Sequence, residues 1–292
     1  MYSGGEPMNH SVKLISSFVD NGVGGNPAGV VLQADGMAEA EMQRLASIAG
    51  YPETAFVSHS DIATVKLDFF TPTKRIPHCG HATVAAFSVL AQQGKVGQGA
   101  HSKETIDGPR HIRIEGDKAY LEQIRRHVTP ITAEQQAAAA HALGLEAEQV
   151  NALATPHVAN VGVSFLVIAL PTMGNLRSLR PDRESIATLS EALGVIGFYV
   201  ISPETEVSGR TISARMFAPY YGIDEESATG MGAGCASIYL YEVLGHKSEH
   251  YLIEQGRLMT PRSPSLIEAE LEVTDGLPHR LWIGGVAKIL EG

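Results

Sequence analysis

Residues 70–83 read FTPTKRIPHCGHAT, and this stretch decides the fold. An alternating apolar segment, residues 65–70, predicts a strand, and the small residues at 82–92 predict a helix after the Cys-Gly turn. A related order recurs later, where Phe-Ala-Pro at 217–219 precedes Thr-Gly-Met-Gly-Ala at 229–233. Each unit is a strand, an irregular loop, a glycine turn and a small-residue helix. The repetition predicts an internal duplication, with two similar lobes whose glycine turns face one cleft.

Other segments carry the periodicity of ordinary helices and strands. The Gly- and Asn-rich residues 21–27 predict a loop. The expected helices are 38–49, 133–143 and 185–193. The expected strands besides 65–70 are 13–19, 28–32, 53–57, 111–114, 119–122, 165–170 and 197–201.

Length and charge exclude several classes of protein. The 292 residues suit two domains of ordinary size. The net charge of −10 and the lack of a basic stripe argue against nucleic acid as a partner. Apolar runs are too short to span a membrane, and no signal peptide is visible, so we expect a cytoplasmic protein. Residues 1–7 precede a second methionine, Met8, and are expected to be a lead-in outside the fold.

The two glycine turns are candidate anion sites. A helix N-terminus presents unpaired backbone N–H groups and partial positive charge, and a glycine there leaves room for a ligand. Gly80 or Gly230 alone would more simply allow a tight turn. As a repeated pair, they favour binding of a carboxylate or another small anion.

Four side chains are candidates for proton transfer. Glu53 opens an apolar strand, where burial would raise the pKa of its carboxyl toward a useful range, although a solvated strand end is an equal alternative. Glu225 and Glu226 form either a solvated acidic turn or a carboxylate at the site. His81 lies in the first helical turn, where it would donate to a bound anion, although most histidines are structural.

The two cysteines argue against a two-thiol epimerase. Cys79 precedes a helix and would be reactive, but Thr229 occupies the equivalent place in the second repeat. Cys235 lies inside the second helix and is expected to belong to the core. No phosphate-binding loop, dinucleotide fingerprint or metal-ligand spacing is present, so neither a cofactor nor a metal is expected.

Taken together, these motifs resemble the phenazine-biosynthesis-like PhzF family, whose fold is shared with diaminopimelate epimerase. The resemblance covers residues 12–290. The segments that carry it are 25–31, 53–56, 70–73, 79–83, 222–230 and 255–256.

The resemblance implies an α+β fold of two pseudo-twofold-related lobes. Each lobe would be a rolled, mostly antiparallel sheet around a central helix, with the active-site cleft between them. The implied N-terminal lobe comprises 8–125 plus 278–292, and the C-terminal lobe comprises 126–277. The final strand, near 281–289, would return to the N-terminal lobe, and family members are typically homodimers.

The resemblance also implies an activity. The best-known member isomerises trans-2,3-dihydro-3-hydroxyanthranilate without a cofactor, and its proton-shuttling glutamate matches Glu53. A histidine matching His81 and an aspartate at the position of Glu226 complete that site. The chain is therefore expected to be an isomerase or epimerase of a small carboxylate-bearing substrate. The residues expected to bind this substrate are Gly80, Thr229, Gly230, Met231 and Asn26.

Three positions depart from the family pattern. Glu226 is one methylene longer than the usual aspartate, Met231 replaces a small residue, and Pro52 replaces a serine. The acid/base chemistry is compatible with these changes, but they count against the phenazine precursor as the substrate. They also motivate an alternative, a non-catalytic module that binds a small molecule or a protein. A thiol-based racemase is disfavoured by Thr229.

Overall fold

The structure, a computed structural model, describes residues 11–290, and the expected lead-in at residues 1–7 lies outside them. By its internal contacts the chain divides into two compact units. Unit 1 comprises the described parts of Met1–Ser17, Pro27–Ala119 and Ala287–Gly292. Unit 2 comprises Phe18–Asn26 and Tyr120–Val286. The internal duplication and the lobe boundaries expected from the sequence stay predictions.

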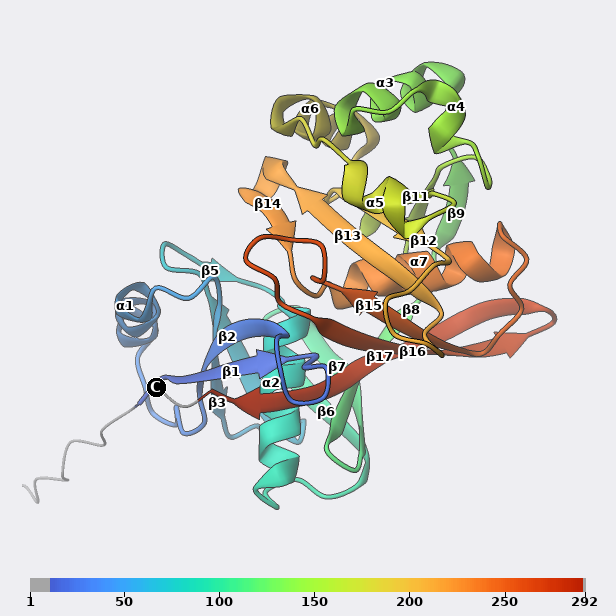
Figure 1. The fold of residues 1–292 in the computed structure, drawn as a ribbon. Coiled ribbons are helices and arrows are strands. Elements are labelled where there is room, and N and C mark those ends of the chain that lie inside the picture. The colour runs from blue at the N-terminus through green and yellow to red at the C-terminus, as the bar shows by residue number, and fades with distance from the viewer. Residues whose placement is uncertain (1–10, 291–292) are drawn as a thin grey trace, which may run out of the picture. The chain divides into compact units, whose positions relative to one another are not determined.

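The described residues form a mixed α/β structure (Figure 1). The strands are β1 (Lys13–Ser17), β2 (Asn26–Val31), β3 (Thr54–Ser58), β4 (Val65–Phe70), β5 (Arg75–Ile76), β6 (Gly99–Thr105), β7 (Gly108–Glu115), β8 (Lys118–Ile124), β9 (His127–Pro130), β10 (His157–Asn160), β11 (Ser164–Ala169), β12 (Phe198–Ser202), β13 (Ile212–Ala218), β14 (Ile223–Glu226), β15 (His250–Gln255), β16 (Ser265–Thr274) and β17 (Leu277–Ile289). The helices are α1 (Glu39–Ala49), α2 (Gly80–Gln92), α3 (Ala133–Leu143), α4 (Ala147–Val150), α5 (Met173–Ser178), α6 (Arg183–Leu193) and α7 (Gly230–Glu242), with a 3₁₀ turn at Pro219–Tyr221.

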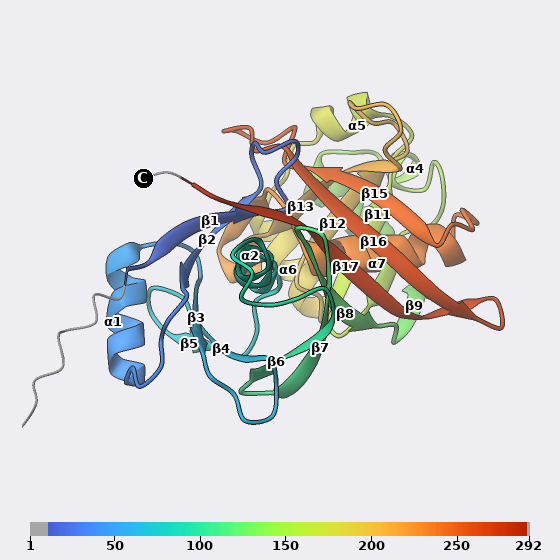
Figure 2. The ribbon, with the colours of Figure 1, turned by 90° about the horizontal axis from the view of Figure 1, so that it is seen from below.

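Unit 1 is a mixed sheet that curves around α2. The pairs β2–β3 and β4–β6 are parallel, whereas β3–β4 and β6–β7 are antiparallel. Figure 2 shows α2 end-on with these strands around it. Every residue from His81 to Leu90 is buried, because this helix is small and apolar on all sides.

The outer face of the unit 1 sheet is covered by α1. Met42 and Ala46 of this helix pack with Val31, Phe56 and Phe70 of the strands. The helix ends at Gly50, which has a φ of 68° and donates its backbone N–H to the carbonyl of Ala46. With α2 on one face and α1 on the other, β3 is buried almost throughout.

Unit 2 has a sheet between two helical layers. Its strand order is β9–β10–β11–β12–β13–β15–β16–β17, with parallel pairs β11–β12 and β13–β15. In Figure 1, α7 lies on one side of β11, β12 and β13, and α3 and α6 lie on the other. All five residues of β12 are buried, as a strand covered on both faces requires.

Small residues let α7 lie close to the strands that cover it. A Cβ atom added at Gly232 would come within 2.4 Å of the ring of Tyr199, and one at Gly234 within 2.0 Å of Gln123 Oε1. A larger side chain at either place would force the helix and the sheet apart.

Most expected elements are confirmed. The helix at 133–143 and the strand at 65–70 match α3 and β4 at both ends. The last residues of β17 pair with β1, with Ile289 opposite Ile15, so the final strand does return to unit 1. The elements β5, β6, β9, β10, β14, β15, β16, α4 and α5 were not expected, because polar residues interrupt the periodicity of several of them.

Candidate active site

Glu53 stands immediately before β3. Its carbonyl accepts a hydrogen bond of 2.9 Å from the N–H of Gly29, which fixes the backbone at this point. The carboxylate is 18 % exposed, and its Oε2 atom lies 3.2 Å from Nε2 of His81. The sequence therefore identified two residues that the fold of unit 1 brings into contact.

His81 lies between the carboxylate of Glu53 and the thiol of Cys79. Cys79 is the N-cap of α2 and is 6 % exposed, and its Sγ atom lies 3.5 Å from Nδ1 of His81. Burial alone would lower the pKa of His81, but the interactions with Cys79 and then with Glu53 outweigh it and hold the pKa well above its ordinary value. The imidazolium form is thus favoured between two groups that can be anions.

The same three residues offer one metal-ligand atom each. These atoms, from Glu53, Cys79 and His81, all lie within 4.8 Å of one another, and no other such group occurs among residues 11–290. A carboxylate, a thiolate and an imidazole suit zinc. The spacing in the sequence did not indicate this cluster, because Glu53 is brought to the other two only by the sheet.

A buried lysine lies beside this cluster, and no pattern in the sequence indicated it. Lys103 of β6 is 0 % exposed, and its Nζ atom lies 2.9 Å from Nδ1 of His78 and 2.6 Å from Oγ1 of Thr83. The pKa of Lys103 is lowered to about 7, chiefly by burial; Cys79 acts in the opposite direction, and Arg110 contributes to the lowering. The pKa of His78 is also well below its ordinary value, through burial and then through Lys103 and Arg110.

In unit 2, Glu226 lies at the end of β14 and is hydrogen-bonded on both carboxylate oxygens. Nδ2 of Asn26 donates to Oε1 at 2.9 Å, and the hydroxyl of Thr229 donates to Oε2. Asn26 also donates to the carbonyl of Ala228 at 2.8 Å. Three residues that the sequence singled out, Asn26, Glu226 and Thr229, therefore form one network.

Gln255 organises this network from β15. Its Oε1 atom accepts from the N–H of Thr229 at 3.1 Å and from the hydroxyl of Tyr199 at 2.9 Å. Its Nε2 atom donates to the carbonyl of Glu226 at 2.7 Å. The sequence identified Gln255 only as a family marker. The structure shows that its amide is hydrogen-bonded to Tyr199, Thr229 and Glu226.

The surroundings of Glu225 and Glu226 differ, and the sequence alone could not predict this difference. Glu225 makes a two-pronged ion pair with Arg215, at 2.8 and 2.7 Å. Arg215 also lies over the ring of Phe217, with Cζ 4.9 Å from its centroid. Glu225 is thus a structural partner of Arg215, whereas Glu226 accepts from the neutral donors Asn26 and Thr229.

Both candidate glycines begin helices. Gly80 and Gly230 are the first residues of α2 and α7, as expected. Phe18, buried and at a φ of 59°, packs close to Gly230, where an added Cβ would lie 3.4 Å from its ring. Met231, next in α7, is half-buried. Anion binding at these termini stays a prediction.

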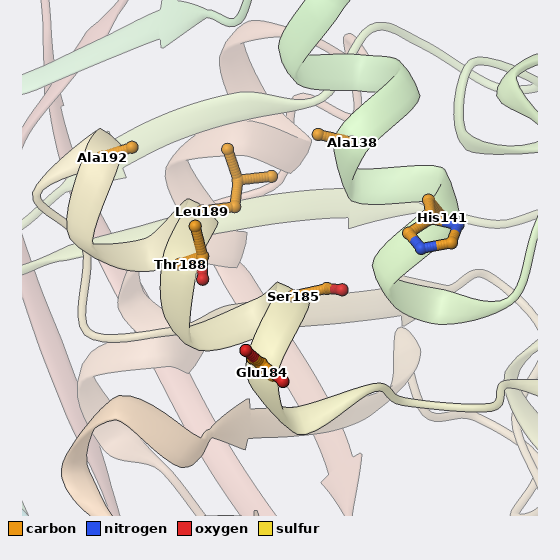
Figure 3. A pocket seen from close by; sticks show the side chains of 7 residues that line it. All are labelled: Ala138, His141, Glu184, Ser185, Thr188, Leu189 and Ala192. Atoms are coloured by element: carbon orange, nitrogen blue, oxygen red, sulfur yellow. The ribbon is translucent and has the colours of Figure 1, made fainter.

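Unit 2 also has a surface groove of about 380 Å³ between α3 and α6 (Figure 3). It is lined by Ala138, His141, Glu184, Ser185, Thr188, Leu189 and Ala192, and none of the residues expected to act on a substrate is among them. The groove contributes nothing to the site described above.

The chain matches one family model and is similar in sequence to several named proteins. The model of the phenazine biosynthesis-like protein family (PhzC-PhzF) matches residues 15–292. An uncharacterized isomerase, YddE of Escherichia coli K12, is 32 % identical over 292 residues, which is 97 % of each chain. The trans-2,3-dihydro-3-hydroxyanthranilate isomerase of Pseudomonas chlororaphis is 27 % identical over 80 % of each chain.

Solved structures show the same fold. A PhzF-family phenazine biosynthesis protein of Bacillus anthracis superposes with a TM-score of 0.86 over 96 % of both chains, at 23 % identity.

None of the helices in residues 11–290 is long and apolar enough to span a membrane.

Proposed function

Because the chain belongs to the phenazine biosynthesis-like protein family, we propose that it is an isomerase that moves a proton between two carbons of a small carboxylate-bearing substrate. The names of its relatives support an isomerase. The observation that carries the proposal is the contact of Glu53 with His81, 3.2 Å apart, at a half-buried carboxylate. A carboxylate held beside an imidazolium is suited to general acid/base catalysis.

In this proposal Glu53 removes a proton from a carbon of the substrate and returns it to another carbon. The electron pair left by the broken C–H bond shifts along the substrate, and no net oxidation occurs, so the reaction needs no cofactor. His81, protonated, and the backbone amides at Gly80 would bind the substrate carboxylate or the developing negative charge.

The unit 2 network is proposed to take part in substrate binding. In this proposal Glu226, hydrogen-bonded to Asn26 and Thr229, presents a carboxylate to a polar substituent of the substrate. Glu225 cannot take this role, because it is bound to Arg215. Gly230 and Met231 begin the helix that follows. The resemblance to the family further supports a homodimer in the cytoplasm, which light scattering and cell fractionation test directly.

Hydrogen exchange in deuterated water tests the role of Glu53. The protein is incubated with trans-2,3-dihydro-3-hydroxyanthranilate and a panel of small amino and hydroxy acids, and mass spectrometry follows products and deuterium uptake. We expect Glu53→Gln to lower turnover about 10²- to 10⁴-fold, because the amide cannot accept the proton. Glu39→Gln, which changes an exposed glutamate of the same unit, is the control.

Two outcomes would count against the proposal. Full turnover by Glu53→Gln would remove Glu53 from the mechanism. No exchange on any compound, although a panel member binds, would favour the non-catalytic binding module. Repeating the assay after treatment with a chelator shows whether activity depends on a metal at Glu53, Cys79 and His81.

The adjacent glutamates of β14 provide a matched pair of variants. We expect Glu226→Gln to lower kcat/KM at least about tenfold with little change in thermal stability, because the amide keeps the shape but loses the charge. Glu225→Gln should lower the melting temperature, because it leaves Arg215 unpaired, and should change kcat/KM little. The reverse pattern in steady-state kinetics and thermal unfolding would show that the two roles have been exchanged.

A further inference from the structure

Glu53, Cys79 and His81 bring three kinds of metal-ligand atom together within unit 1. Nε2 of His81 lies 3.2 Å from Oε2 of Glu53 and 3.9 Å from Sγ of Cys79. Zinc bonds of about 2.0 Å to nitrogen or oxygen and about 2.3 Å to sulfur place tetrahedral ligands about 3.4–3.6 Å apart. These two distances are therefore already close to those of a zinc site. The remaining distance, between oxygen and sulfur, is at most 4.8 Å and would have to shorten by no more than about 1.2 Å.

The backbone fixes the places from which these side chains project. The carbonyl of Glu53 accepts from the N–H of Gly29 at 2.9 Å, just before β3. The carbonyl of Cys79 accepts from both the hydroxyl and the N–H of Thr83, at 2.6 and 3.2 Å, as the first turn of α2 closes. His81 belongs to the same turn and is buried. A metal would thus meet ligands whose backbone is already ordered, which lowers the entropic cost of binding.

The carboxylate oxygen that faces the other two ligands lacks a hydrogen bond. Oε2 of Glu53 is buried, and no group in residues 11–290 meets it with the geometry of a hydrogen bond, although Nε2 of His81 lies 3.2 Å away. A buried carboxylate oxygen without such a partner costs free energy. A cation bound to Oε2 would compensate this cost.

The chemistry of the three ligands selects the metal. Magnesium and calcium take oxygen ligands, whereas thiolate and imidazole suit zinc. A carboxylate and a thiolate supply two negative charges, which balance the charge of Zn²⁺ when the imidazole is neutral. Three protein ligands also leave the fourth position of a tetrahedral ion open to water or to another small ligand.

We propose that Glu53, Cys79 and His81 bind one Zn²⁺ ion and that this ion inhibits the isomerase. The inhibition rests on the proposed function, but the metal site does not. An Oε2 atom bonded to zinc is a weaker base toward a carbon acid, and an Nε2 atom bonded to zinc carries no proton to donate to the substrate. The protons of the thiol and the imidazolium pass to the solvent when the metal binds.

Cobalt titration tests the metal site without requiring turnover. The full chain is treated with a chelator, dialysed and titrated with Co²⁺ near neutral pH, and thiolate-to-cobalt charge-transfer absorption is followed in the ultraviolet. Cobalt held by histidines elsewhere on the chain gives no such band. We expect the band to saturate at one equivalent and to disappear on addition of Zn²⁺, which gives the zinc Kd by competition.

Four variants identify the ligands. Cys79→Ser should abolish the band, and Cys235→Ala should keep it, because Cys235 is buried in α7. Glu53→Gln should keep the band and raise the zinc Kd at least about tenfold, since even loss of an outer partner of a ligand costs about 10- to 100-fold in affinity. Glu39→Gln, at an exposed glutamate of the same unit, should leave the Kd unchanged.

Two binding results would overturn the metal site. One is the absence of a charge-transfer band in the wild-type protein. The other is an unchanged zinc Kd in Glu53→Gln, whose replaced side chain is partly exposed, so this result decides even if Cys79→Ser does not fold.

Inhibition is measured separately, on any compound that the wild type turns over in deuterated water. We expect saturating Zn²⁺ to lower turnover at least about tenfold and a chelator to restore it, because acid/base catalysis contributes at least that much. The ratio of the rates with and without zinc should approach one in Cys79→Ser, whatever the basal rate of that variant. Turnover that is unchanged or raised by bound zinc would overturn the inhibition. If no compound is turned over, the proposed function fails, while the cobalt band and the zinc Kd still report the metal site.

Discussion

His81 and Lys103 are both buried bases of unit 1, and their surroundings shift their pKa values in opposite directions. For His81, the effect of burial is outweighed by Cys79 and Glu53, so the pKa is raised. For Lys103, burial dominates and lowers the pKa to about 7. Strongly shifted pKa values are frequent at sites of proton transfer. Each shift also predicts how stability depends on pH.

The raised pKa of His81 means that the folded state binds its proton more tightly than the unfolded state. Its contribution to stability is complete below the unfolded value of about 6.5 and is lost as pH rises through the folded pKa. We therefore expect the difference in unfolding free energy between wild type and His81→Gln to be largest near pH 6 and to shrink with rising pH. Urea unfolding at a series of pH values measures it, and a difference that grew with pH would contradict the assignment.

The lowered pKa of Lys103 has the opposite sign. The unfolded chain keeps this proton up to a pH of about 10.4, so the charged lysine costs stability most fully below pH 7, and the cost falls as pH rises above 7. We expect Lys103→Met to gain stability relative to wild type at pH 6 and to lose that advantage by pH 10. Thermal unfolding at both pH values checks this, and a constant difference would show that Lys103 titrates normally.

At the scale of the element, the central helices depend on small side chains. Both α2 and α7 begin at a glycine and are buried through most of their length. Their sequences predicted helices because small apolar residues have no strand alternation. The close approach of the strands to α7 could not be predicted, because it depends on Tyr199 and Gln123, which come from other elements.

Gly232→Ala tests this close packing. The added Cβ would meet the ring of Tyr199 at 2.4 Å, so Tyr199 or the helix must move. We expect a loss of about 1–3 kcal/mol of stability by chemical denaturation. Gly97→Ala is the control, because a Cβ there meets nothing within 4 Å. Equal stability of the two variants would show that the ring of Tyr199 can move aside without a loss of unfolding free energy.

At the scale of the whole molecule, a buried ion-pair network joins the segment Phe18–Asn26 to the rest of unit 2, from which it is distant in sequence. Asp20, 2 % exposed, accepts from Arg210 at 2.8 Å and from Arg257. Arg257 also pairs with Glu254 at 2.8 Å. Burial acts to raise the pKa of Asp20, but the two arginines prevail and lower it. The network thus fixes a segment that lies almost two hundred residues from Arg210 in the chain.

Asp20→Asn leaves both arginines without their shared partner. We expect a loss of about 3–5 kcal/mol at pH 7 by urea denaturation, as for other broken buried pairs. Because the folded pKa is lowered, the contribution of Asp20 is present above its unfolded value of about 3.9 and is lost as pH falls. The difference from wild type should therefore shrink below pH 4. Asp61→Asn, at an exposed position, should change stability by less than about 0.5 kcal/mol.

The sequence by itself determined what depends on near neighbours in the chain. It predicted α1, α2, α3, α6 and several strands, because periodicity and glycine positions are local properties. It also identified Glu53, His81 and Glu226 as candidates, because residue type and motif order are written in the chain. These roles remain proposals, and the family assignment is established by the match over residues 15–292.

Only the tertiary structure decided which of these groups meet. The contact of Glu53 with His81 and Cys79 requires β3 and α2 to pack together. The burial of Lys103 depends on which face of β6 lies toward α2, and its segment, GAHSKET, has no apolar alternation that would reveal this face. Burial, and with it the pKa of a lysine or a histidine, is a property of the packed fold, because it depends on atoms from segments far apart in the chain.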